Sequence, residues 1–273
     1  MTVSAPVRRL SPAFAVLLLS ATAFAQAQQT TKPFEPTVGQ PGKDVVWVPT
    51  PQALVDRMLD MAKVTPQDYL MDLGSGDGRT VITAAKRGVR ARGVEYNPDM
   101  VALSQKNLEA AGVTNLGSFV RGDIFETDFS QATVITLFLL PDLNIKLRPT
   151  ILNMRPGTRV VSNSFTMGDW ESDETSRVEG DCTSWCTAHM WIVPAKVAGT
   201  WDLGGGSRLV LEQTYQMVTG TITTSGNTTA VKGRLRGDQI TLTAGTTQYT
   251  GSVKGNAMNG TLGTGGNWSA TKR

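Results

Sequence analysis

The sequence predicts an α/β fold whose first part is a doubly wound, mostly parallel sheet and whose second part is a small antiparallel β-meander or barrel. Short apolar runs alternate with helix-period patterns over residues 45–197, as in strands joined by crossover helices. These runs are apolar throughout, so both faces of the sheet are expected to be covered. The composition changes near Ala198, and Gly, Thr and short alternating stretches dominate residues 198–273. We therefore expect two domains with that boundary.

Residues 1–25 have the pattern of a signal peptide. Two arginines precede an apolar run over residues 13–19, and small residues around Ala25 offer a cleavage site. The run is shorter than the roughly 20 residues that span a bilayer, so no stable transmembrane segment is expected after signal removal. We expect a periplasmic or secreted protein; the alternative is membrane anchoring through an uncleaved N-terminus. Residues 26–44, rich in Gln, Thr, Pro and Gly, are expected to form a flexible lead-in.

The elements of the first domain follow from local patterns. A helix is expected to begin at Thr50-Pro51, with Thr50 as its cap and Pro51 at the first helical position. Its apolar face consists of side chains at helical spacing, namely Leu54, Val55, Met58, Leu59 and Ala62. Strands are expected over residues 69–73, 91–95, 117–121, 133–139, 159–165 and 188–193. Further helices are expected over residues 79–87 and 98–111 and around Leu143, Ile145 and Leu147.

The second domain contains a weak internal repeat in which apolar residues flank a glycine at a period of two. The repeated segments are residues 218–222, 231–235, 249–253 and 258–262. A period of two places the three residues of each segment on one face of a strand, and the glycine permits tight curvature. We expect a closed meander filled by its own side chains. Its seven basic residues outnumber its three acidic ones, which indicates a solvated face or, alternatively, a docking surface.

A glycine-rich loop between a predicted strand and a predicted helix is the main candidate site. A dinucleotide fingerprint requires a third glycine where this chain has Arg79, so a nicotinamide dinucleotide is not expected. The candidate cofactor residues are instead Asp72 at the strand end, Gly74, Ser75, Gly76 and Gly78 in the loop, Glu95 at the end of the next strand, and Asp123 after the third. An acidic residue such as Glu95 can accept hydrogen bonds from both ribose hydroxyls. The alternative is that Asp72 and Asp123 only cap helices or turns.

At these residues the chain resembles the class I S-adenosylmethionine-dependent methyltransferases, a resemblance that covers roughly residues 45–194. It implies a Rossmann-like methyltransferase domain with S-adenosyl-L-methionine as its cofactor. It also implies Asp72 near the methionine part, Gly74 and Gly76 allowing close approach, Glu95 on the ribose, and Asp123 on the adenine amino group. Thr50 is implied to face the cofactor as well.

A closer resemblance is to the family of the ATP synthase c-subunit lysine methyltransferase and its bacterial relatives. It is carried by VPTP at residues 48–51, by DLGSGDGRTVI and GVEYNPDMVALS, and by LFLLPDLNIKLRP followed by PGTRVVSNSF. It implies N-methylation of a protein lysine by in-line displacement. The predicted export signal and the C-terminal barrel depart from that family and leave the acceptor open. The alternatives are a small-molecule methyltransferase and an exported binding module that keeps the fold without turnover.

The acceptor is expected to meet the loop Leu140-Pro141-Asp142, which follows the fourth strand, where this fold presents acceptor contacts. Pro141 would shape the loop, and Asp142 would hold or relieve the incoming ammonium as a catalytic group. The alternative is that Asp142 caps the helix that follows.

Composition narrows the chemistry and the partners. His189 is the single histidine, so histidine-dependent hydrolysis or a histidine-rich metal centre would be hard to build, and no metal is expected. Removal of the predicted signal peptide takes away two arginines, which leaves 24 of the 26 basic residues against 23 acidic ones. A nearly neutral chain argues against nucleic acid as the main partner, which leaves a protein or small-molecule acceptor.

Cys182 and Cys186 are expected to form a short disulfide in an oxidising compartment; the alternative is two free thiols.

Overall fold

The structure is a computed structural model that describes residues 1–5 and 34–273. Most of the expected signal peptide and the first part of the expected lead-in therefore lie outside the described residues. Residues 34–273 form one unit, and the fold described below is that of this unit alone. Within the described residues, no helix combines the length and apolarity needed to cross a membrane.

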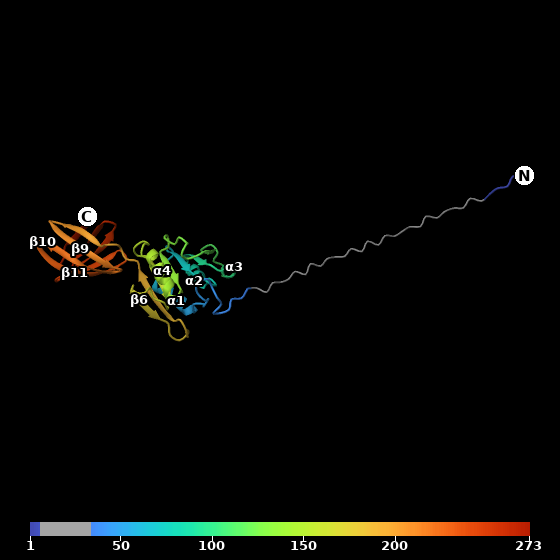
Figure 1. Cartoon of the computed structure of the whole chain (residues 1–273), viewed down its shortest axis with the longest axis horizontal. Coiled ribbons are helices and arrows are strands. Elements are labelled where there is room, and N and C mark those ends of the chain that lie inside the picture. The colour runs from blue at the N-terminus through green and yellow to red at the C-terminus, as the bar shows by residue number, and fades with distance from the viewer. Residues whose placement is uncertain (6–33) are drawn as a thin grey trace. The chain divides into compact units, whose positions relative to one another are not determined.

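A seven-stranded sheet organises the first half of the unit (Figure 1), in the order β3-β2-β1-β4-β5-β7-β6. Its strands are β1 Tyr69–Leu73, β2 Arg90–Glu95, β3 Gly117–Arg121, β4 Val134–Leu137, β5 Arg159–Asn163, β6 Glu174–Arg177 and β7 Thr187–Ile192. The first five strands are mutually parallel, whereas β7 is antiparallel to β5 and to β6. This confirms the doubly wound, mostly parallel sheet. The strand order reverses between β1 and β4, the point at which such sheets bind ligands beyond their carboxyl ends.

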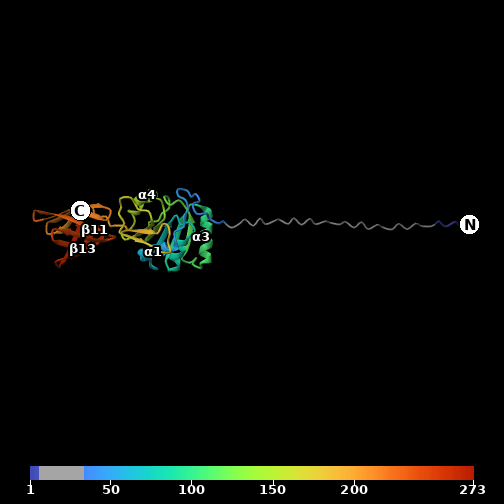
Figure 2. The same ribbon diagram turned by 90° about the horizontal axis from the view of Figure 1, so that it is seen from below.

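Four helices, α1 Gln52–Met61, α2 Arg79–Lys86, α3 Pro98–Ala110 and α4 Pro141–Ile151, cover the sheet. Leu54 of α1 and Val81 of α2 belong to one apolar cluster against the sheet, and Leu147 of α4 belongs to another. Figure 2 shows α4 and α1 on opposite sides of the strands. The central strands β1, β4 and β5 are buried on both faces, which explains their mostly apolar sequences. The outer strands differ, because β2 exposes Arg90 and Arg92 and most of β6 is exposed.

The start of α1 differs from the prediction. The helix begins one residue later than expected, with Pro51 at its N-cap and no side-chain capping bond. The Thr50 hydroxyl instead accepts a hydrogen bond from Nδ2 of the buried Asn163, at 3.2 Å, and the Thr50 carbonyl accepts one from Arg79. Thr50 thus ties the start of α1 to the end of β5 and to the start of α2.

The second half of the unit is a closed eight-stranded antiparallel barrel in the order β10-β11-β12-β13-β14-β15-β8-β9. Its strands are β8 Gly199–Gly204, β9 Ser207–Thr214, β10 Met217–Thr224, β11 Asn227–Arg236, β12 Gln239–Ala244, β13 Thr247–Lys254, β14 Ala257–Leu262 and β15 Asn267–Lys272. A single apolar cluster around the fully buried Trp201 fills the interior. The repeated glycines are required where strands approach closely, because a Cβ at Gly260 would lie 1.9 Å from the Thr250 carbonyl oxygen.

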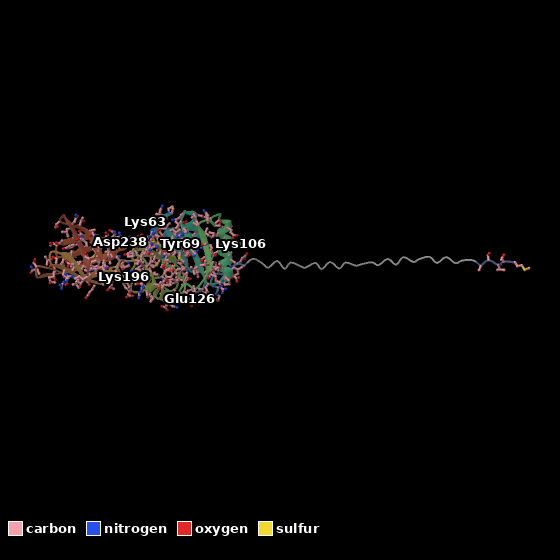
Figure 3. The ribbon with its side chains drawn as sticks, turned by 90° about the horizontal axis from the view of Figure 1, so that it is seen from above. Lys63, Tyr69, Lys106, Glu126, Lys196 and Asp238 are labelled. Carbon is pink, nitrogen blue, oxygen red and sulfur yellow. A yellow bond between two sulfur atoms is a disulfide. The ribbon has the colours of Figure 1, made fainter. Side chains whose placement is uncertain are left out.

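The last strand of the sheet ends at Ile192 and the first strand of the barrel begins at Gly199, which brackets the expected change at Ala198. Contacts join the two halves across this boundary. The Tyr215 ring stacks on the buried Trp170 ring at 5.9 Å, and Arg234 pairs with Asp173 at 2.7 Å. Away from these contacts, charged side chains such as Lys106 and Asp238 are exposed (Figure 3).

Candidate active site

A cavity of about 530 Å³ lies at the carboxyl ends of the parallel strands, at the reversal point between β1 and β4. This volume suits a small organic cofactor with room for a second group. Seven of the eight predicted cofactor residues line it, namely Thr50, Asp72, Gly74, Ser75, Gly76, Glu95 and Asp123. The topology brings them together because the carboxyl ends of parallel strands meet at one edge of a sheet.

Gly78 is the eighth predicted residue, and it does not line the cavity. It is the N-cap of α2, with φ of 85°. A Cβ at this position would lie 2.4 Å from Cζ of Phe119 and 2.8 Å from Cβ of Ser104. The glycine is therefore required for the packing of α2 against β3 and α3, and its expected role in cofactor contact is corrected to a structural one.

The glycine loop is held to the neighbouring strand by its backbone. The amides of Gly74 and Ser75 both donate to the Val94 carbonyl, at 2.9 and 3.0 Å. Gly74 has φ of 85° and Gly76 φ of 53°, a left-handed backbone that side chains disfavour. The Ser75 hydroxyl points toward Gly93 and is buried with no hydrogen-bond partner among residues 1–5 and 34–273. Ser75 thus presents its backbone, and not its hydroxyl, to a ligand.

Glu95 braces this loop at the end of β2. Its Oε2 accepts a hydrogen bond from the Gly76 amide and its Oε1 accepts one from the Asn97 amide, both at 2.9 Å. Each carboxylate oxygen can accept more than one hydrogen bond, so capacity remains for ligand hydroxyls. The sequence predicted a contact between Glu95 and the ligand, but it did not predict the hydrogen bonds by which Glu95 holds the glycine loop.

Asp72 is a buried carboxyl on the cavity wall, 6% exposed. Burial raises its pKa to about 7, against the opposing effect of a 2.6 Å hydrogen bond donated by Thr136, and the nearby carboxylates Glu95 and Asp77 raise it further. Near neutral pH this carboxyl is therefore poised between its two protonation states. A cation bound beside it would favour the charged form.

The segment before α1 forms a small hairpin over the cavity instead of a plain lead-in. The Gly39 amide donates to the Trp47 carbonyl at 2.8 Å, the Trp47 amide donates to the Gln40 carbonyl at 2.9 Å, and residues 40–50 line the cavity. The Trp47 ring packs on the glycine loop, since a Cβ at Gly76 would lie 2.7 Å from its Nε1. The sequence predicted a flexible lead-in up to residue 44, but the end of that segment forms the tight turn of this hairpin. The apolar cluster around Trp47 was the signal that could have located it.

Lys43, at the tip of this hairpin, reaches Asp123 after β3. Its ammonium donates a short hydrogen bond to the Asp123 carboxylate, and the ammonium also lies 5.0 Å from the Tyr96 ring centroid. The bond from Lys43 holds the pKa of Asp123 below its usual range. A second Asp123 oxygen accepts from the Phe125 amide at 2.9 Å. Sequence reasoning missed Lys43, because 80 residues separate it from its partner.

Of the three predicted acceptor residues, only Leu140 lines the cavity. Pro141 is the first residue of α4 and Asp142 lies in its first turn, and both are exposed. The chain crosses the cavity at residues 138–140 and then turns into the helix, which carries Pro141 and Asp142 away. The structure therefore does not place them as catalytic groups, and the position of Asp142 in the first turn suits the helix dipole.

Three aromatic side chains also line the cavity, and we call them the aromatic trio: Phe138, Phe165 and Trp185. The Phe138 ring lies 6.1 Å from that of Phe165, and the Trp185 ring lies 5.9 and 5.3 Å from these two. Phe138 directly follows β4 and Phe165 closely follows β5, a position that could have flagged them. Trp185 comes from the loop between β6 and β7, which carries the expected Cys182–Cys186 disulfide.

The lining of the cavity is acidic. Its carboxylates are Asp44, Asp72, Asp77, Glu95 and Asp123, and its cations are Lys43 and Arg79. Arg79 pairs with Asp77 at 2.5 Å, and Lys43 pairs with Asp123. Lys43 also lies 3.9 Å from Asp44, which leaves Asp72 and Glu95 without a cationic partner in the lining, and these two favour a cationic ligand. Among residues 1–5 and 34–273, no three His, Cys, Asp or Glu side chains are grouped to hold a metal ion. His189 lies on β7 outside the cavity, with Nδ1 3.0 Å from the Thr175 hydroxyl.

Comparison with known proteins identifies relatives of this site. Residues 72–174 match the family model described as the ANTKMT methyltransferase domain. A protein-lysine N-methyltransferase of Saccharolobus islandicus is 46% identical over 138 residues, which cover 50% of this chain and 86% of that protein. The ATP synthase c-subunit lysine N-methyltransferase of Mus musculus is 37% identical over 117 residues. The match covers 42% of this chain, and it spans only about half, 47%, of the mouse protein.

A solved structure agrees with this fold. The crystal structure of an RNA methyltransferase from Salinibacter ruber in complex with S-adenosyl-L-homocysteine shares 49% sequence identity with this chain. It superposes with a TM-score of 0.52 and covers 55% of this chain and 96% of that one. The family model matches residues of the sheet half, and the two relatives and the solved structure each cover 42–55% of this chain.

Proposed function

Since the chain belongs to the family of the protein-lysine N-methyltransferases, which use S-adenosylmethionine, we propose that it transfers a methyl group to the side-chain amine of a protein lysine. The observation that carries this proposal is the acidic cavity at the strand-reversal point, with a glycine loop at one end and the aromatic trio at the other. Both reactants are cations, a sulfonium and an ammonium, and this lining attracts both.

The residues present fit the cofactor. The two left-handed glycines, Gly74 and Gly76, leave the loop without side chains that would fill the cavity. Glu95 would accept from the ribose hydroxyls, Asp123 from the adenine amino group, and Asp72 would face the methionine part. When bound, S-adenosylmethionine supplies a methyl group on a sulfonium, and the sulfur departs with the bonding electron pair as a neutral thioether.

The chain itself positions and desolvates the acceptor. A lysine ammonium must first release a proton, and an apolar environment lowers the pKa of an amine and so assists that loss. The neutral nitrogen would then accept the methyl group as the carbon–sulfur bond breaks, and the released proton would pass to water. Holding both reactants in line is the main contribution required of the protein.

One relative is described as an RNA methyltransferase, which makes RNA the second candidate acceptor. The acidic lining disfavours it, because RNA binding depends on cations that neutralise phosphates. The test is transfer of radiolabelled methyl from S-adenosylmethionine to extracted proteins and, separately, to extracted RNA, with Glu95→Ala as the inactive control. Label released as methylated lysine after acid hydrolysis supports the proposal. Label confined to RNA, or cofactor binding without any transfer, contradicts it.

We also propose that the protein acts outside the cytoplasm, in the periplasm or as a secreted protein. This proposal is supported by the signal-peptide pattern of residues 1–25. It is also supported by the Cys182–Cys186 disulfide, because disulfides are typical of oxidising compartments. Fractionation with N-terminal sequencing should find a mature form that begins near Gln26 or Gln28. Full-length, cofactor-loaded protein in the cytoplasm would contradict it.

A further inference from the structure

The order of the strands locates the reacting end of the cavity. Glu95 ends β2 and Asp123 follows β3, so the ribose and adenine ends lie on the β2 and β3 side of the reversal point. Phe138 follows β4 and Phe165 follows β5, on the other side. The methyl group would therefore lie near β1 and β4, and the aromatic trio would be the next surface beyond it.

Trp185 closes this surface from outside the sheet. It is 44% exposed, yet it lines the cavity and lies within 6 Å of both phenylalanine rings, measured between ring centroids. Its φ of 57° is a left-handed conformation that costs a bulky residue about 1–2 kcal/mol. An exposed tryptophan in that conformation requires an external constraint to hold it.

The short loop around Trp185 supplies this constraint. Cys182 and Cys186 are bonded across four positions, and Cys186 is buried, only 3% exposed. The Cys186 carbonyl accepts a 2.9 Å hydrogen bond from the Val178 amide, which fixes the inner end of the loop to the residue directly after β6. The disulfide thus ties the outer end of the loop to a buried anchor, and Trp185 is the residue directly before that anchor.

We propose that the aromatic trio is the subsite for the acceptor's ammonium group and that the Cys182–Cys186 loop positions Trp185 as its specificity-determining wall. This inference rests on the proposed function and deepens it. Ring faces attract a cation and offer few hydrogen-bond acceptors, so they desolvate the ammonium and accommodate a methylated one well. Leu140, half-exposed beside the trio, adds apolar surface for the methylene stem of the side chain.

The test measures binding without turnover. Protein saturated with S-adenosylhomocysteine is titrated with Nε-trimethyllysine amide, and with tetramethylammonium, by calorimetry or NMR. Trp185→Ala should weaken binding of both probes about 3- to 30-fold, the range for a cation on an aromatic face. Trp185→Tyr should restore most of it, which a merely structural role would not predict. The double variant Cys182→Ser with Cys186→Ser should weaken binding in the same direction.

The controls separate this inference from the proposed function. Met217→Ala removes an exposed apolar side chain of the barrel, outside the cavity, and should leave probe binding unchanged. Cofactor affinity should stay within threefold in every variant, because Trp185 lies beyond the cofactor end. If wild-type protein binds cofactor but neither probe, or Trp185→Ala binds the probes as well as wild type, the subsite is wrong and the proposed function stands. If wild type fails to bind S-adenosylmethionine, the proposed function falls.

Discussion

Replacing Glu95 with glutamine tests the cofactor end of the cavity most directly. The two carboxylate oxygens each accept one backbone N–H, from Gly76 and from Asn97. An amide retains one acceptor oxygen and turns an NH2 group toward the other N–H, so one donor loses its partner at about 1–3 kcal/mol. A ligand hydroxyl that donates to the same carboxylate loses a charge-assisted bond of similar size. The lost brace lowers the stability of the loop with and without ligand, so the lost ligand bond sets the change in affinity: cofactor binding should weaken by about 1.5–3 kcal/mol, or roughly 10- to 160-fold.

Isothermal titration calorimetry with S-adenosylhomocysteine measures this change. The matched control is Glu126→Gln, which makes the same chemical change at an exposed glutamate labelled in Figure 3 and outside the cavity. Its affinity should equal that of the wild type. If Glu95→Gln melts at a lower temperature but binds cofactor within threefold of wild type, Glu95 is only a brace for the loop, and its assignment to the ribose is wrong.

Three further predictions follow from the same geometry. Asp72 keeps its proton to about pH 7 in the folded chain against an ordinary pKa of 3.8, so the native state binds more protons between these values. The free energy of unfolding should therefore decrease from about pH 4 to pH 7, and Asp72→Asn should lose that slope in urea titrations. Gly78→Ala forces a Cβ against Phe119 and should cost about 2–4 kcal/mol of stability by urea unfolding; a wild-type midpoint would refute the packing role. A chain ending at Pro194 loses the Tyr215 stack but no cavity residue, so it should melt lower yet keep its cofactor affinity; an unfolded circular dichroism spectrum would show that the domain boundary is misplaced.

The sequence alone predicted the parts that depend on neighbours along the chain. Apolar runs without alternation identify strands covered on both faces, and the glycine pattern of the second half indicates a closely packed barrel. The placement of Asp72, Glu95 and Asp123 at strand ends sufficed to predict one cavity, because parallel strands direct their carboxyl ends to the same edge. These three strand-end carboxylates therefore required no knowledge of long-range packing.

The acceptor end was decided by tertiary structure. Leu140-Pro141-Asp142 reads as one loop, but α4 begins within it and carries Pro141 and Asp142 to the surface. Trp185 reaches the same end of the cavity from a disulfide loop, and at the cofactor end Lys43 and Trp47 reach it from a hairpin before the sheet. No local pattern in the chain encodes such meetings, because they depend on how the whole sheet is ordered and on which side chains remain to cover its edge.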